Sequence, residues 1–136
     1  MMSYEATQRR RKMAESTVVN PANAVKAENI TSQIALSCSF GRLENQSVHK
    51  IGSLIMLSVL FTATQNLNAN TDYTLTATHA SDRTKPVLRS QVGGANHSLI
   101  RNFVSSNSSG NFSFAASGAI SSGTAFWLNY IYMCSS

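Results

Sequence analysis

The most apolar run of the chain spans residues 52–64 and contains neither a charged residue nor a proline. In an extended strand, alternate side chains point to opposite faces. One face of this run would carry only apolar residues: Ile55, Leu57, Val59, Phe61 and Ala63. Its β-branched and aromatic content, with Gly52 before it and the asparagine-rich residues 66–70 after it, favours a strand over a helix. We therefore predict a central β-strand.

The second face of this strand is apolar in its first half, where it carries Leu54, Met56 and Leu60. A sheet of a β-sandwich usually leaves its outer face polar and solvated. The sequence therefore predicts that a second subunit covers this face and that these residues form an oligomer interface.

Residues 124–133 show the same two-sided character. Phe126, Leu128, Tyr130 and Tyr132 alternate with a second set: Ala125, Trp127, Asn129, Ile131 and Met133. Two strands that are apolar on both faces suit the same buried sheet, so we expect this strand to pair with residues 52–64. We expect Trp127 to pack in the core or at the oligomer interface.

The rest of the chain from residue 29 alternates short apolar patterns with polar turns. Strands are predicted at residues 30–40, 72–79, 87–92 and 98–104, and in a short segment around Phe112 and Phe114. Turns are predicted at residues 41–46, 81–86 and 105–110 and at Gly93–Gly94, with Pro86 excluded from the middle of a sheet. This pattern predicts an all-β protein, an antiparallel β-sandwich of jelly-roll-like form.

Residues 1–28 differ from the rest in composition and are interpreted as an N-terminal arm, followed by a sandwich domain at residues 29–136. The arm concentrates the basic residues Arg9, Arg10, Arg11 and Lys12, and residues 4–16 favour a short helix that would be marginal alone. Such a block is a solvated tail, a docking element for other virion proteins, or a nucleic-acid contact.

The composition narrows the class of protein. Only 12% of the 136 residues are charged, the net charge is +5, and Ser, Thr, Asn and Ala fill much of the chain, a mixture typical of β-rich extracellular or virion surfaces. No secretory signal is recognisable, so we expect assembly in a cytoplasm. The run at residues 52–64 is shorter than the roughly 20 residues of a membrane-spanning helix, and no membrane insertion is expected.

The two cysteines, Cys38 and Cys134, lie far apart in the sequence and have no metal-ligand spacing. Two small buried thiols are the favoured interpretation, and a disulfide between them remains an alternative. We predict no zinc site and no cofactor.

Several segments together resemble a known family. They are residues 48–58 (VHKIGSLIMLS), residues 69–71 (ANT), residues 83–86 (RTKP), residues 110–112 (GNF) and residues 124–132 (TAFWLNYIY). In this order they resemble the C-terminal head domains of tailed-phage tail-fibre and baseplate receptor-binding proteins, over about residues 30–133. The resemblance implies a trimeric β-sandwich at the virion surface that often binds a saccharide of the host wall.

The residues argue against catalysis. A glycosidase needs two carboxylates roughly 5 to 9.5 Å apart, whereas Asp72 and Asp82 are expected at opposite ends of a strand and its loop. The three histidines have no metal-binding spacing, and no serine lies in a nucleophile-elbow motif. His79 is expected to be partly buried and hydrogen-bonded.

A non-catalytic saccharide site would use polar groups on loops. The candidates are Asp82, Arg83, Lys85 and Asn96, although a charge cluster such as the first three is more often a solvated turn than a ligand site. We expect a homotrimeric phage virion protein that binds host-surface glycan. The alternatives are a purely structural virion component, such as a head fibre or capsid-decorating protein, and a small jelly-roll coat protein whose arm binds nucleic acid.

Overall fold

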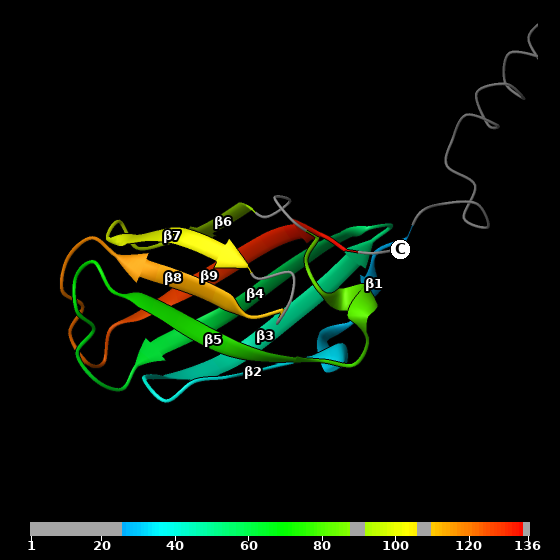
Figure 1. Cartoon of the computed structure of the whole chain (residues 1–136). Helices are drawn as coiled ribbons and strands as arrows, with labels where there is room; N and C mark the ends of the chain where they lie inside the picture. The colour runs from blue at the N-terminus through cyan, green and yellow to red at the C-terminus, as the bar shows by residue number, and fades with distance from the viewer. Residues whose placement is uncertain (1–25, 88–91, 106–109, 135–136) are drawn as a thin grey trace, which may run out of the picture.

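The computed structural model describes residues 26–87, 92–105 and 110–134, which form two antiparallel sheets packed face to face (Figure 1). The strands are β1 (Glu28–Asn29), β2 (Ile34–Ser37), β3 (Gly41–Ile51), β4 (Leu54–Ala63), β5 (Asp72–His79), β6 (Val92–Ala95), β7 (Ile100–Ser105), β8 (Phe112–Ala116) and β9 (Ala125–Met133). Two 3₁₀ turns, η1 (Thr31–Gln33) and η2 (Asp82–Thr84), complete the described elements. The predicted all-β sandwich is confirmed.

One sheet has the strand order β1-β3-β4-β9-β6 and the other the order β2-β5-β8-β7. Among the described strands, only β3–β4 and β7–β8 are consecutive neighbours within a sheet, so the other connections cross between the two sheets. This wrapping gives the jelly-roll-like form and places β4 at the centre of the five-stranded sheet.

The alternation predicted for residues 52–64 is confirmed along β4. Every second residue from Ile55 to Ala63 is buried, and every second residue from Leu54 to Thr62 is half-buried. Gly52, at a φ of 59°, opens the two-residue turn between the paired residues Ile51 and Leu54. Glycine accepts this left-handed conformation without a Cβ clash, which suits it to the first position of such a hairpin turn.

The predicted pairing of the two double-sided strands is also confirmed. β4 runs antiparallel to β9, with Leu57 opposite Tyr130 and Phe61 opposite Phe126. The inward side chains of both strands meet aromatic rings of the four-stranded sheet. The Phe61 ring centroid, for example, lies 5.4 Å from that of Phe114 on β8 of the four-stranded sheet and 5.1 Å from that of Phe126 on the neighbouring strand β9. These aromatic contacts form the centre of the hydrophobic core.

Two tyrosines of β9 form hydrogen bonds to other parts of the fold: Tyr130 links β9 to β8 of the other sheet, and Tyr132 links β9 to the η2 turn. The Tyr130 hydroxyl donates to the Ser113 carbonyl oxygen at 2.8 Å, and the Tyr132 hydroxyl donates to the Thr84 carbonyl oxygen at 2.7 Å. Both side chains are buried, and a buried hydroxyl without a partner would be costly. Burial raises the pKa of both phenols, and the neighbouring Cys134 adds to the rise at Tyr132.

The prediction of a turn at residues 41–46 was wrong, because these residues begin the long strand β3. A β-bulge between Glu44 and Ser47, with Asn45 at a φ of 54°, interrupts the pairing with β4 and obscures the alternation. The side chains of Arg42 and Glu44 form an exposed ion pair on this strand. A charged, bulged segment of this kind disfavours pairing with a foreign strand.

The prediction that Gly93–Gly94 separates two strands was also wrong, because both glycines lie inside β6, paired with Tyr130 and Asn129 of β9. A Cβ at Gly93 would lie 2.2 Å from the Phe103 Cβ. The glycine is therefore required by the close approach of Phe103 and does not mark a chain turn.

The structure tests the remaining strand and cysteine predictions, while some other predictions lie outside the described residues. The strand at residues 72–79 matches β5 in both bounds, while that at residues 30–40 is reduced to β2 with η1 before it. Cys38 and Cys134 are free thiols, the first half-buried and the second buried. The helix expected in the arm, the basic block Arg9–Lys12, residues 88–91 of one predicted strand and residues 106–109 of one predicted turn lie outside the described residues.

Candidate functional site

The outer face of the five-stranded sheet carries an unusual set of side chains for a solvent-facing surface. Antiparallel register places Met56 opposite both His49 of β3 and Ile131 of β9, and Leu54 opposite both Ile51 and Met133. The exposed fractions of Ile51, Ile131 and Met133 are 37%, 40% and 40%. We call these six residues the apolar end of the outer face.

A second row lies further along the same face. Leu60 of β4 is paired with Trp127 of β9, and both side chains are half-buried. Between this row and the apolar end, Ser58 stands opposite Ser47 and Asn129. The face thus alternates an apolar end, a neutral polar band and a second apolar row. Its charged pair flanks this second row on β3, where Glu44 stands opposite Leu60 and Arg42 opposite Thr62.

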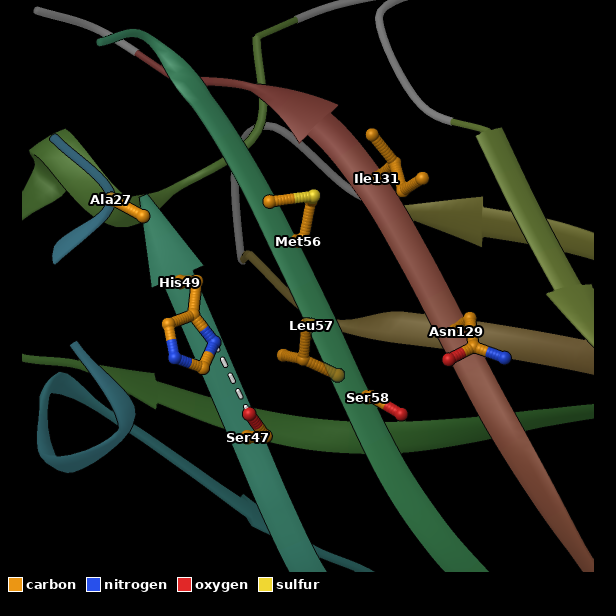
Figure 2. A pocket seen from close by; sticks show the side chains of 8 residues that line it. All are labelled: Ala27, Ser47, His49, Met56, Leu57, Ser58, Asn129 and Ile131. Atoms are coloured by element: carbon orange, nitrogen blue, oxygen red, sulfur yellow. Dashed lines mark hydrogen bonds between the residues drawn. The ribbon is translucent and has the colours of Figure 1, made fainter. Parts of the chain in front are cut away.

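A shallow hollow of about 390 Å³ lies over the junction between the apolar end and the polar band. Figure 2 shows its lining residues on β3, β4 and β9, with Ala27 at one rim. The lining is Ala27, Ser47, His49, Met56, Leu57, Ser58, Asn129 and Ile131. The Ser47 hydroxyl and the His49 Nδ1 are 3.2 Å apart, and the lining contains no carboxylate, lysine or arginine.

The four residues predicted as an oligomer interface all lie on this outer face. Within the single chain each of these side chains is only half-buried, so none of them is fully enclosed in the core: Leu54, Met56, Leu60 and Trp127. Sequence reasoning did not select His49, Ile51, Ile131 or Met133. Alternation along residues 124–133 had placed Ile131 and Met133 opposite the core face, and only the register with β4 shows that they adjoin Met56 and Leu54.

Three of the predicted saccharide contacts lie together in and after η2. Asp82 and Arg83 are exposed, Lys85 is half-buried, and the Lys85 Nζ lies 3.1 Å from an Asp82 carboxylate oxygen. The Ser81 hydroxyl accepts a hydrogen bond from the Arg83 backbone N–H, and this contact shapes the turn. The Asp82 side chain is 93% exposed even in this pair, so Asp82 and Arg83 both present their charges to solvent.

Asn96, the fourth candidate, lies at the opposite end of the sandwich. Its side-chain oxygen accepts a hydrogen bond from the Trp127 backbone N–H at 2.8 Å, near the start of β9. The η2 loop instead adjoins the end of β9, where the Val87 N–H donates to the Met133 carbonyl oxygen. At about 3.4 Å per residue, the intervening part of β9 separates the two places by roughly 20 Å. The structure therefore does not unite the four candidates in one site.

His79 links β5 to the η2 loop. Its Nδ1 lies 2.8 Å from the Thr84 hydroxyl and its Nε2 lies 2.8 Å from the Gly110 carbonyl oxygen. The side chain is half-buried, as the sequence predicted. With both ring nitrogens engaged, His79 holds the loop in place and offers no free base to a substrate.

Within the described ranges, no group of three or more His, Cys, Asp or Glu side chains is arranged to hold a metal ion. No helix among the described residues is long and apolar enough to cross a membrane. The outer face of the five-stranded sheet offers an apolar surface, neutral hydrogen-bonding groups and a hollow.

No family model, no curated protein and no solved structure matches the chain.

Proposed function

We propose that this chain is a non-catalytic structural protein of a bacteriophage virion, which forms a homotrimer through the outer face of its five-stranded sheet. In this proposal, the sandwich belongs to a fibre or baseplate and binds a host-surface saccharide through its loops. The phage assignment and the number of three copies rest on the family resemblance of residues 30–133.

The observation that carries the proposal is the apolar end of the outer face. Three of its side chains, Ile51, Ile131 and Met133, are more than a third exposed and adjoin the half-buried Leu54 and Met56. Contiguous large apolar side chains on a soluble domain mark an interaction surface. For comparison, the outward residues of β5 on the other sheet, Thr74, Thr76 and Thr78, are exposed and polar.

The mass of the protein in solution tests the assembly. Light scattering after size exclusion should give about 44 kDa, which is three chains of 14.7 kDa each. A mass of one chain at micromolar concentration would contradict the proposal. A mass of two chains would retain the interface and refute the trimer.

A saccharide pull-down tests the binding role separately. Arg83→Ala should weaken retention on host-wall polysaccharide, whereas Asn96→Ala should leave it unchanged if the η2 loop is the site. The pairing of Lys85 with Asp82 and the distant position of Asn96 favour a second candidate, a purely structural virion component without saccharide binding. An intact oligomer that is retained on no host polysaccharide would support this second candidate.

A further inference from the structure

The N-terminal arm joins the fold at the rim of the hollow. The described chain begins at Lys26, and the next residue, Ala27, is one of the residues that line the hollow. Glu28 and Asn29 then form β1, the edge strand of the five-stranded sheet. Twenty-five residues therefore precede a point that already lies against the apolar end of the outer face.

The direction of β1 indicates where these residues lead. β1 is antiparallel to β3, with Asn29 opposite His49 and Glu28 opposite Lys50. Followed toward the N-terminus, the chain thus runs toward Gly52, where β3 ends and the hairpin turns back. A segment that continued the direction of β1 would lead past Gly52 and away from the hollow of its own subunit.

The part of the arm nearest the fold suits an uncharged hollow. Residues 16–25 (STVVNPANAV) contain no charged side chain, and they combine valine, alanine and proline with asparagine, serine and threonine. The hollow presents the same two kinds of group, apolar at Met56 and Ile131 and neutral hydrogen-bonding at Ser58 and Asn129. The basic block Arg9–Lys12 lies further out and would not be desolvated by this contact.

We propose that residues 16–25 of one copy lie in the hollow of a neighbouring copy, so that the subunits of the oligomer exchange arms. This inference rests on the proposed function, because it requires a second copy at the outer face. Ten extended residues reach about 33 Å, whereas the hollow spans three strands, or about 10 Å. The exchanged segment covers Met56 and Ile131 and links the subunits through an arm as well as through the sheets.

Cysteine cross-linking of the full-length chain tests the exchange. In a Cys38→Ser, Cys134→Ala background, Ala22→Cys places a thiol in the arm and Ser58→Cys places one in the hollow. Mild oxidation should then give covalent two-chain and three-chain species on a non-reducing gel. The matched control replaces Ser58→Cys by Thr76→Cys, on the outer face of the other sheet, and should give single chains.

The mass of the same sample before oxidation separates the two proposals. An oligomer with cross-links between chains supports the exchange. An oligomer whose cross-links form within one chain, or that forms none, overturns the exchange and leaves the proposed function standing. A single-chain mass overturns both. Equal cross-linking in the Thr76→Cys control shows unspecific collision and also overturns the exchange.

Discussion

The hydrogen bond from Tyr132 to Thr84 should make a measurable contribution to the stability of the sandwich. The Tyr132 hydroxyl lies 2.7 Å from the Thr84 carbonyl oxygen, and Thr84 is only 1% exposed. In Tyr132→Phe the carbonyl loses this donor at a place that water does not reach. A buried polar group left without a partner costs about 1–3 kcal/mol.

Thermal unfolding measures this loss. For a domain of about this size, 1 kcal/mol corresponds to roughly 4 °C in Tm, so Tyr132→Phe should unfold about 4–12 °C below the wild type. The ring remains in contact with Phe112, whose centroid lies 5.5 Å away. The fall in Tm therefore reflects the loss of the hydroxyl group and not a change in the packing of the ring.

Tyr73→Phe is the matched control. The Tyr73 hydroxyl accepts a hydrogen bond from the Asn68 backbone N–H at 2.6 Å, but Asn68 is exposed and water can replace the lost acceptor. We expect a loss of less than about 1 kcal/mol there. Equal Tm values for Tyr132→Phe and the wild type would refute the hydrogen bond between β9 and the η2 turn, and a larger loss in Tyr73→Phe would refute the ranking by burial.

Three further predictions concern the core and the thiols. Burial raises the pKa of Tyr130 and Tyr132 above the ordinary value of about 10. Below pH 10 both phenols are neutral in the folded and in the unfolded chain, so their contribution to the free energy of unfolding is fully present. Above pH 10 the phenols ionise in the unfolded chain before they ionise in the folded one. The free energy of unfolding measured with urea should therefore fall by up to about 1.4 kcal/mol per pH unit per tyrosine, and by less in the double Phe variant. Burial raises the pKa of the Cys38 thiol. Labelling of the folded protein by a thiol reagent at neutral pH should therefore be slow until urea unfolds the chain. Fast labelling of the folded protein that is abolished in Cys38→Ser would contradict this prediction. Gly93→Ala places a Cβ 2.2 Å from the Phe103 Cβ and should cost about 1–3 kcal/mol in urea unfolding, whereas Gly94→Ala meets nothing within 4 Å and should be almost neutral; equal losses would refute the close packing at Gly93.

The sequence predicted the parts of the fold whose alternation is strong and uninterrupted. β4 and β9 alternate large apolar side chains without a break, because both are interior strands of the five-stranded sheet. β3 was misread at residues 41–46 for two reasons. No described strand pairs with this part of β3 on its outer side, which allows Arg42 and Glu44, and its bulge shifts the period. The role of Gly93 was misread because the residue that requires a glycine there, Phe103, lies on another strand.

The candidate site was predictable only in part for a related reason. Alternation within residues 52–64 selected Leu54 and Met56, because the opposite face was so clearly the core. Their neighbours Ile131 and Ile51 come from other strands, and the register that brings them together is set by long-range pairing. The position of Ala27 beside the hollow likewise follows from the pairing of β1 with β3.

The central claim is that the outer face of the five-stranded sheet is an assembly surface. The mass of the Met56→Asp variant in solution tests this claim most directly. A carboxylate at this position would be desolvated in the interface, which is costly. Thr76→Asp introduces the same charge on the exposed face of the other sheet. By light scattering, the wild type and Thr76→Asp should be oligomers, and Met56→Asp should be a folded single chain by circular dichroism. An oligomer of unchanged mass in Met56→Asp would show that this face is solvated and would contradict the claim.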